Sequence, residues 1–142
     1  AIGALAPTGT VLDLFSGTGS ISIEFASRGC GDVTAVESNA HCVKLINATL
    51  AQFGVKGVTV WRSDALSFLE RCETPFDIIF ADPPFVYPAT ASVPRIVAVR
   101  KLLKAGGWLI VEHSSKDDLS AEPGFREKRV YGSLAFSIFV SE

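Results

Sequence analysis

The chain has 142 residues, with 13 basic and 15 acidic side chains and a formal net charge of −2. This length fits one domain, and 48% hydrophobic with 20% charged residues is typical of a globular protein. The composition excludes a disordered chain, a collagen-like repeat and a strongly basic protein that coats nucleic acid.

The cysteine and histidine residues are few and widely spaced. Cys30, Cys42 and Cys72 form no CxxC pair, and His41 and His113 lie far apart in the sequence. This pattern predicts reduced thiols and no metal site. No apolar run reaches the ~18 residues that suggest a membrane helix, and the chain does not begin with a secretory signal. We therefore expect a cytoplasmic protein without a membrane partner. We also expect a monomer.

Strand-like and helix-like segments alternate along the chain. Short apolar runs that stop at Gly, Pro or Asp predict buried parallel strands, and apolar residues at helical spacing between them predict helices. Asn39 is suited to cap the second helix, and Gly54 to end it. The predicted strands are 10–15, 32–37, 58–63, 76–81 and 108–113, with a hairpin of 125–131 and 134–140 around Gly132-Ser133. The predicted helices are 20–28, a segment through Val43, Ile46, Leu50 and Phe53, 65–71 and 92–104. The order predicts an α/β sandwich with a mostly parallel sheet.

A glycine-rich turn follows the first predicted strand, in the segment Asp13-Leu-Phe-Ser-Gly-Thr-Gly-Ser20. Gly17 and Gly19 permit a tight turn and the close approach of a ligand, although a turn without any ligand would look the same. Position 22 is Ser, so the dinucleotide pattern G-x-G-x-x-G is broken, and no phosphate-binding P-loop is present. Because Asp13 would repel a pyrophosphate, we expect a nucleoside-like ligand with positive charge and no phosphates.

Carboxylates also follow the second and third predicted strands. Glu37 is placed to accept hydrogen bonds from both ribose hydroxyls of a nucleoside, or is simply a solvated charge. Asp64 is placed to cap the helix that follows, to accept from an adenine amino group, or to do both. Ligands bind at the carboxyl ends of strands in open α/β sheets, where all of these residues are expected.

The most specific motif is Asp82-Pro83-Pro84-Phe85, at the end of the fourth predicted strand. Two successive prolines force an extended backbone and remove two amide donors, which leaves the Asp82 carboxylate and nearby carbonyl groups as acceptors. Phe85 offers a flat face on which a base can stack, worth ~1–3 kcal/mol. The structural alternative is a strand ended by prolines and followed by a core phenylalanine.

Together, the segments DLFSGTGS, VTAVES, RSDA and DPPF resemble the class I S-adenosylmethionine-dependent methyltransferases. They look most like the bacterial family that methylates an exocyclic guanine amine in small-subunit ribosomal RNA. The resemblance runs from about Val11 to Val140. It implies a Rossmann-like sandwich with a mostly parallel seven-stranded sheet and an antiparallel strand from the C-terminal hairpin. It also implies S-adenosylmethionine as cofactor without a metal, and ribosomal RNA or the small ribosomal subunit as partner.

The resemblance also implies a role for each motif residue. Asp82 and the Pro83 carbonyl would bind the target amine in the turn that Pro84 completes, with Phe85 stacked on the base. Glu37 and Ser38 would bind at the ribose of the cofactor, and Asp64 with Ala65 at its adenine. The methionine end would be lined by Asp13, Phe15, Gly17, Thr18 and Gly19.

The expected chemistry is methyl transfer to an amine whose two N–H groups are held by the DPPF turn. Positioning of the reacting groups can supply ~7–11 kcal/mol of barrier reduction. The target base must leave its stack, so a loop or single-stranded site is favoured. DPPF-like motifs also occur in DNA adenine and protein glutamine methyltransferases, which remain alternatives, as does a scaffold that binds cofactor without catalysis. A nicotinamide dehydrogenase would leave the DPPF motif unexplained.

Two further expectations concern the ends of the chain and its basic residues. The resemblance implies one methyltransferase domain over residues 1–142 that lacks a native N-terminal helical segment, since only about ten residues precede the first strand and no methionine is present. Two sets of basic residues are candidates for phosphate contacts, although ordinary surface charges would look the same. They are Arg95, Arg100, Lys101 and Lys104, after the DPPF turn, and Arg126, Lys128 and Arg129, in the hairpin.

Overall fold

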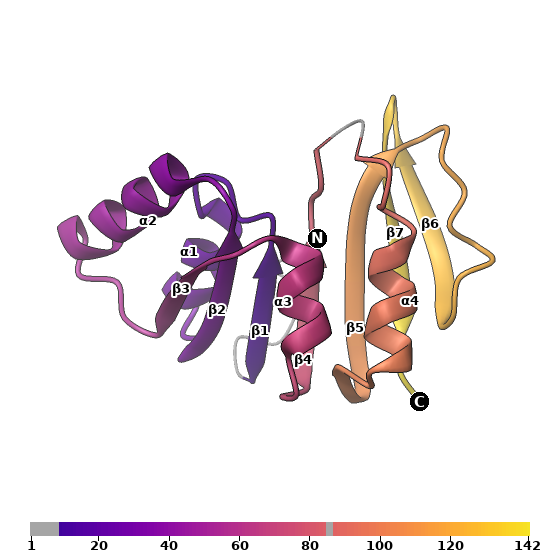
Figure 1. The fold of residues 1–142 in the computed structure, drawn as a ribbon, viewed down its shortest axis with the longest axis horizontal. Helices are drawn as coiled ribbons and strands as arrows, with labels where there is room; N and C mark the ends of the chain where they lie inside the picture. Colours follow the sequence, from indigo (N-terminus) through magenta and orange to yellow (C-terminus); the bar gives the residue numbers. More distant parts are fainter. Residues whose placement is uncertain (1–8, 85–86) are drawn as a thin grey trace.

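The computed structural model describes residues 9–84 and 87–142, which alternate between strands and helices and end in a hairpin (Figure 1). The strands are β1 (Thr10–Leu14), β2 (Asp32–Glu37), β3 (Val58–Arg62), β4 (Phe76–Ala81), β5 (Leu103–Ser114), β6 (Phe125–Tyr131) and β7 (Leu134–Val140). The helices are α1 (Ser20–Ser27), α2 (Ala40–Gln52), α3 (Ala65–Arg71) and α4 (Ser92–Val99).

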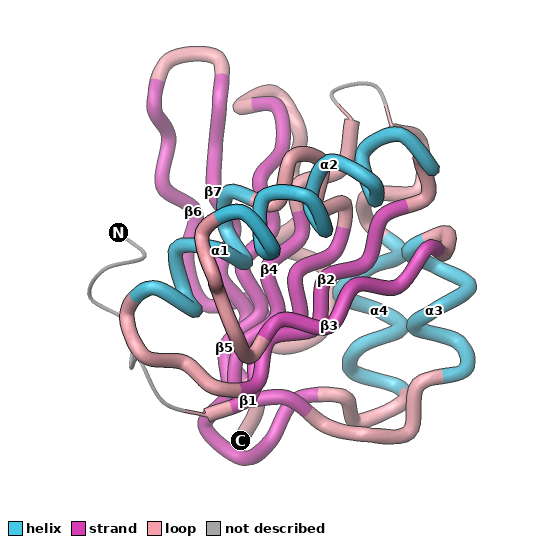
Figure 2. Tube along the Cα trace, turned by 90° about the vertical axis from the view of Figure 1, so that its left-hand side faces the viewer, coloured by secondary structure: helices cyan, strands magenta, loops and turns pink. Residues whose placement is uncertain are grey.

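All seven strands join one sheet in the order β3-β2-β1-β4-β5-β7-β6. Strands β1 to β5 are parallel to one another, whereas β7 is antiparallel to both β5 and β6. Helices α3 and α4 cover one face of the sheet, and α1 and α2 cover the other (Figures 1 and 2). The predicted Rossmann-like sandwich, including its antiparallel strand, is confirmed.

The two faces of the sheet bury different side chains because strand residues alternate in direction. Toward α3 and α4, Leu12 and Leu14 join the larger core cluster. Toward α1, Val11 packs with Phe25 in a smaller cluster. Asp13 lies between Leu12 and Leu14 in the sequence, so its carboxyl points to the α1 face.

Most predicted elements agree with the structure to within one residue at each end. The strands predicted at 10–15 and 58–63 and the helix predicted at 20–28 each end one residue earlier. Asn39 caps α2 as expected, since its side chain accepts from the Cys42 amide at 3.0 Å. Gly132 has φ 65° at the hairpin turn.

The helix predicted at 92–104 was wrong at its C-terminal end. Helix α4 ends at Val99, because Lys101 takes a left-handed conformation with φ 55°. The Leu102 amide then bonds the Val97 carbonyl at 3.0 Å, and the Lys101 amide bonds Ala98 at 3.2 Å, which is a Schellman motif. Leu102 is fully buried by this ending. The strand predicted at 108–113 correspondingly starts earlier, at Leu103.

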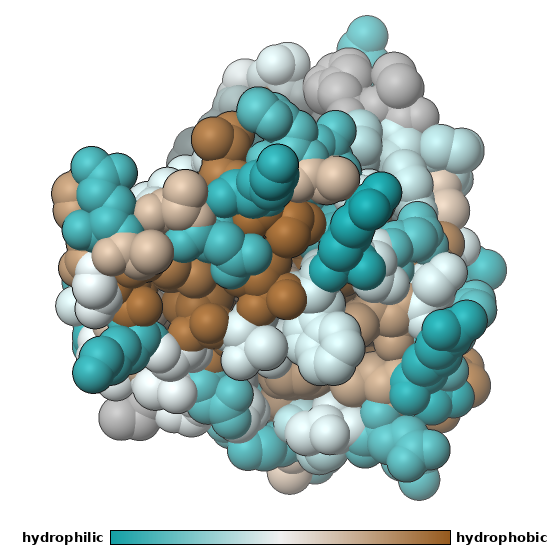
Figure 3. Space-filling view, turned by 60° about the vertical axis from the view of Figure 1, so that its left-hand side comes forward, coloured by the Kyte–Doolittle hydropathy of each residue, from teal (hydrophilic) through white to brown (hydrophobic). Residues whose placement is uncertain are grey.

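The side of the molecule formed by α2 and β3 leaves large hydrophobic side chains open to solvent. Leu45, Phe53 and Trp61 are between 44% and 70% exposed. Figure 3 shows hydrophobic side chains gathered on this side, bordered by hydrophilic ones. Because β3 is the outer strand of the sheet, this surface lies away from the central strands β1 and β4.

Candidate active site

Strands β1 and β4 lie side by side at the centre of the sheet, where the direction of the strand order reverses. From β1 the chain moves outward through β2 to β3, and it returns to the other side of β1 as β4. Such a switch point leaves a crevice at the carboxyl ends of the two strands, which is where open α/β sheets bind ligands. The glycine turn, after β1, and Asp82, after β4, lie at this edge of the sheet. The Asp82 amide lies 3.5 Å from the Leu14 carbonyl.

The turn after β1 is held in a conformation that favours glycine. Gly17 and Gly19 have φ of 56° and 82°. A Cβ at Gly19 would lie 3.0 Å from an Ile46 side-chain carbon on α2, whereas one at Gly17 would meet nothing within 4 Å. Gly19 therefore permits close packing of the turn on α2, and Gly17 borders open space. Phe15 also has a positive φ, of 58°, a strained conformation for a residue with a side chain, at ~1–3 kcal/mol.

Glu37 holds this turn in place. Its Oε1 accepts from the Gly17 amide at 2.8 Å, and its Oε2 accepts from the Asn39 amide at 2.9 Å. Both carboxylate oxygens are thus already hydrogen-bonded to the backbone, with lone pairs left for further donors. Ser38 and Thr18 are exposed beside this turn.

Asp13 is a buried carboxyl at the base of the turn. It is 1% exposed, and its Oδ2 accepts from the Ser22 hydroxyl at 2.7 Å. Burial raises the pKa of Asp13 from 3.8 to about 6, with a smaller contribution from the charge of Asp82. The serine that breaks the dinucleotide pattern is therefore the hydrogen-bond partner of this carboxyl.

Asp64 caps helix α3, which confirms the first of its two predicted roles. Its Oδ2 accepts from the Ser67 amide at 3.0 Å and from the Ser67 hydroxyl at 3.2 Å. Ala65, the first residue of α3, is buried. Asp64 follows the carboxyl end of β3, as Glu37 ends the neighbouring parallel strand β2.

Tyr87 joins the two sides of the crevice and was missed in the sequence. Its ring packs edge-on against Phe15 with centroids 5.1 Å apart. Burial raises the pKa of its hydroxyl, and the charge of Asp64 raises it further. The signal in the sequence is an aromatic residue three positions after Pro84, whose carbonyl accepts from the Tyr87 amide at 2.8 Å.

The DPPF turn presents Asp82 at the mouth of the crevice. Asp82 and Pro84 are exposed and Pro83 is buried. Partial burial of the Asp82 carboxyl raises its pKa, although hydrogen bonding with Glu112 opposes the shift. Phe85 lies outside the described residues, so its predicted stacking role stays a prediction.

Glu112 is the second site residue that the sequence did not reveal. It is half-buried on β5, within hydrogen-bonding reach of Asp82. Burial, the charge of Asp82 and the hydrogen bond between the two carboxyls raise the pKa of Glu112 from 4.5 to about 6. Its only sequence signal is a charge within an apolar run, WLIVEH, which does not identify its partner.

The first basic set lies mostly away from this crevice. Lys104 pairs with Asp77 at 3.3 Å near the amino end of β4, and the Arg100 side chain donates to the Cys72 carbonyl at 2.9 Å. Arg95 pairs with Glu122 at 2.9 Å. Contrary to the prediction, Arg100, Lys101 and Lys104 lie beyond the end of helix α4, and Arg95 alone of this set lies on it.

The second basic set lies on β6, as predicted. Lys128 donates to the Ser115 and Asp117 carbonyls, whereas Arg126 and Arg129 are exposed. Arg129 pairs with Glu127 at 3.1 Å.

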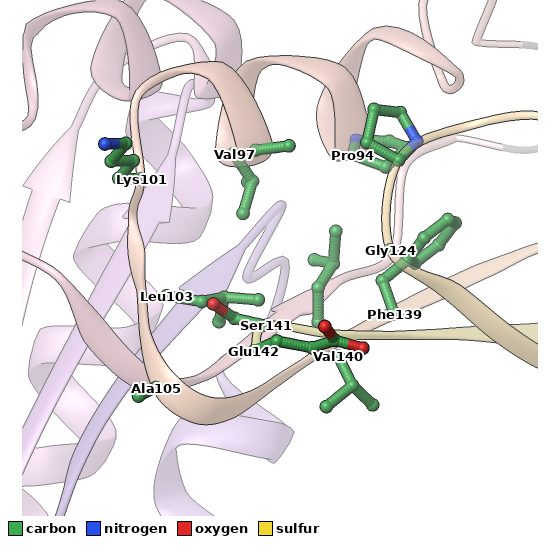
Figure 4. A pocket seen from close by; sticks show the side chains of 13 residues that line it. Pro94, Val97, Lys101, Leu103, Ala105, Gly124, Phe139, Val140, Ser141 and Glu142 are labelled. Atoms are coloured by element: carbon green, nitrogen blue, oxygen red, sulfur yellow. The ribbon is translucent and has the colours of Figure 1, made fainter.

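A separate hollow of about 330 Å³ lies between α4, the start of β5 and the end of β7 (Figure 4). Its lining includes Val97, Lys101, Leu103 and Phe139. Since β5 starts here, the hollow is at the opposite end of the strand from Glu112. None of the motif residues lines this hollow, so it is not the candidate active site.

Neither a metal cluster nor a membrane helix is found in the part of the chain that the structure describes. Within residues 9–84 and 87–142, no three His, Cys, Asp or Glu side chains are grouped to hold a metal ion. None of the helices in those ranges has the length and apolar character needed to cross a membrane.

Sequence comparisons identify a family and named relatives. The family model described as "Conserved hypothetical protein 95" matches residues 2–140. The chain is 28% identical over 145 residues to "Putative rRNA methyltransferase YlbH" of Bacillus subtilis, covering 97% of this chain and 79% of that protein. It is also 28% identical over 140 residues to "Ribosomal RNA small subunit methyltransferase D" of Escherichia coli, covering 92% of this chain and 68% of that protein.

Solved structures share the fold. "Putative methyltransferase yhhF from Escherichia coli" has a TM-score of 0.86 and 26% identity, covering 94% of this chain and 77% of that one. The T. thermophilus 16S rRNA N2 methyltransferase RsmC, in complex with AdoMet and guanosine, has a TM-score of 0.77 and 23% identity, covering 94% of this chain and 38% of that one. The chain therefore has the same Rossmann-like fold as these two structures.

Proposed function

The chain belongs to the family described as conserved hypothetical protein 95, and from this premise we propose that it methylates the exocyclic amino group of a guanine in small-subunit ribosomal RNA. The methyl donor is S-adenosylmethionine. The named relatives support methyl transfer to ribosomal RNA. The guanine amino group is the part of the proposal that rests on the DPPF turn.

The observation that carries the proposal is the position of Asp82 beside the glycine turn. Strand β1 is parallel to β4 and pairs with it directly, so both strands end at the same edge of the sheet. The Asp82 amide lies against the Leu14 carbonyl at this edge. The charge of Asp82 also contributes to the raised pKa of Asp13. This arrangement supports a role for both motifs in one reaction.

The residues of the crevice fit S-adenosylmethionine. Asp13, Glu37 and Asp64 offer carboxylates, which suit a cation, ribose hydroxyls and an adenine amine, but not phosphates. A Cβ at Gly17 would meet only open space, so the turn leaves room for a ligand. We infer that Phe15, Thr18 and Gly19 shape the methionine end, that Ser38 lies by the ribose, and that Ala65 lies by the adenine.

The donor supplies a methyl group already activated by its sulfonium. The chain then has to orient the acceptor amine, whose lone pair is delocalised into the base. The Asp82 carboxylate and the Pro83 carbonyl accept from its two N–H groups and turn the lone pair toward the methyl. The surplus proton leaves through Asp82, which solvent reaches. Most of the rate gain is positioning, with electrostatic stabilisation of the developing positive charge.

Transfer of a labelled methyl group tests this function. Small ribosomal subunits, transcribed ribosomal RNA, DNA and cellular protein are offered in parallel. We expect label in N2-methylguanosine from small-subunit RNA. Label in N6-methyladenine of DNA or in protein glutamine would show that ribosomal RNA is not the substrate. Methylation of an amino group by the DPPF turn would still stand. Binding of S-adenosylhomocysteine without transfer to any of them would indicate a scaffold.

A further inference from the structure

Glu112 lies next to Asp82 because of the register between β4 and β5. These strands are parallel, with Ala81 opposite Val111, so the next residue of each strand reaches the same edge of the sheet. Alternation places Val111 in the larger core cluster and turns Glu112 to the α1 face, the face of the Asp13 carboxyl. The two carboxyls are within hydrogen-bonding reach of each other.

The described residues place acceptors here and supply the two carboxyls with no N–H donor. Among residues 9–84 and 87–142, no N–H or hydroxyl group of the chain donates to either carboxyl, and neither takes part in an ion pair. The neighbour of Glu112 across the sheet is Phe136, and Arg129 lies beyond it on β6. The Arg129 guanidinium is paired with Glu127. Two carboxyls that receive no N–H group from the described residues favour a ligand that brings two N–H groups.

We propose that Glu112 is a specificity-determining residue that accepts the N1–H of the target guanine while Asp82 accepts from the adjacent amino group. This inference rests on the proposed function and names how the base is chosen. Guanine carries two neighbouring donors on this edge, and they relieve the repulsion between the two carboxylates. Adenine carries an acceptor, N1, next to its amino group, so a carboxylate would face a lone pair.

The discrimination is expected to be large for a physical reason. A site built to hydrogen-bond a particular N–H rejects an analogue that lacks it, because the buried polar group of the site loses its partner. Glu112 is half-buried, so water replaces the missing donor only in part. Phe136, opposite Glu112 on β7, adds an apolar surface beside the acceptors.

The test compares Glu112→Gln with a matched Glu70→Gln control. Gln is isosteric with Glu, and its amide can donate to adenine N1 or accept from guanine N1–H. Glu70 is an exposed residue of α3, on the opposite face of the sheet. Transcribed small-subunit RNA is the substrate, and each labelled nucleoside is identified. Cofactor affinity is measured with S-adenosylhomocysteine, and folding is followed by thermal melting.

We expect Glu112→Gln to lower kcat/KM for the formation of methylguanosine by about tenfold, because a neutral acceptor replaces a charged one. Label in methyladenosine should rise, while S-adenosylhomocysteine affinity stays within about twofold. Unchanged kcat/KM with label only in methylguanosine would overturn the role of Glu112 and leave the proposed function standing. If the unaltered protein labels no guanine, the proposed function fails, and this inference fails with it.

A second measurement needs no variant. Free guanosine and 1-methylguanosine are compared as inhibitors of methyl transfer by the unaltered protein. The added methyl group removes N1–H, so 1-methylguanosine should inhibit at least about tenfold more weakly. Equal inhibition by the two nucleosides would exclude a contact between Glu112 and N1–H.

Discussion

The two halves of the crevice differ in how far their polar groups are already satisfied. On the β1–β3 side, Glu37 bonds two backbone amides, Asp13 bonds Ser22, and Asp64 caps α3. On the β4–β5 side, within the described residues, Asp82 and Glu112 have only each other. We infer that the cofactor half is preorganised by the fold, whereas the acceptor half is completed by the N–H groups of its substrate.

This difference predicts that changes on the two sides separate binding of the cofactor from turnover. Substitutions among the acceptors should change the rate and the choice of base. Substitutions in the preorganised half should change both cofactor affinity and stability, because the same hydrogen bonds hold the fold and shape the pocket.

The largest effect is expected for Asp82→Ala. Loss of an oriented acceptor at a developing charge costs about 10²–10³ in kcat. Among the described residues the Asp82 side chain bonds only Glu112, so we expect the variant to keep its fold. S-adenosylhomocysteine affinity should stay within about twofold. Single-turnover rates and calorimetric titration measure the two quantities. Turnover within about threefold of the unaltered protein would remove Asp82 from the mechanism.

Asp13→Asn should raise stability and weaken cofactor binding. Burial raises the pKa of Asp13 to about 6, so the folded state holds this proton more tightly than the unfolded chain. Its contribution to stability is then full below pH 3.8 and is lost as pH rises through about 6. A shift of about two units corresponds to ~3 kcal/mol at most. At pH 8 the neutral Asn should be more stable by up to that amount.

Urea denaturation from pH 5 to pH 8 checks the Asp13 prediction. The advantage of Asp13→Asn should shrink as pH falls, while Asp32→Asn, at an exposed position on β2, should show no such trend. If Asp13→Asn gains stability and binds the cofactor with unchanged affinity, the Asp13 carboxylate does not contribute to cofactor binding.

Glu37→Gln should have an intermediate effect. The amide keeps one acceptor oxygen for Gly17 or Asn39 and places an NH₂ group against the other amide. A hydrogen bond to a charged group contributes about 1.5–3 kcal/mol, so S-adenosylhomocysteine should bind about 10–100-fold more weakly. Calorimetric titration gives the affinity, and a melt gives the stability. Lower stability with normal affinity would limit Glu37 to holding the turn.

Local signals explain why much of the fold could be predicted. Glycine, proline and the Asn39 cap mark the ends of elements through contacts with near neighbours in the sequence. The end of α4 could not be predicted in this way. It depends on burial of Leu102 in the core and on pairing of Leu103 with Phe76, a partner far away in the sequence.

The same distinction holds for the site. Asp13, Glu37 and Asp64 could be placed at strand ends because each follows its own apolar run. Glu112 and Tyr87 could not, because their significance lies in contacts across the crevice. Glu112 gains its partner from the register of β4 with β5, and Tyr87 packs on Phe15.

The smallest effect is expected for Arg129→Ala, which tests where RNA lies on the acceptor side. Arg129 is exposed on β6, two strands from Glu112, and on the same face of the sheet. If it neutralises one phosphate, its loss should weaken RNA binding at low salt and reduce the slope of log K against log salt by about 1.

Lys101→Ala is the matched control, because Lys101 lines the hollow at the other end of β5. Binding isotherms at several salt concentrations should show a reduced slope for Arg129→Ala alone. Equal slopes for the two variants and the unaltered protein would place the RNA backbone elsewhere. A reduced slope for Lys101→Ala alone would place the RNA backbone near α4. The RNA would then have to reach Asp82 and Glu112 from that side of the sheet.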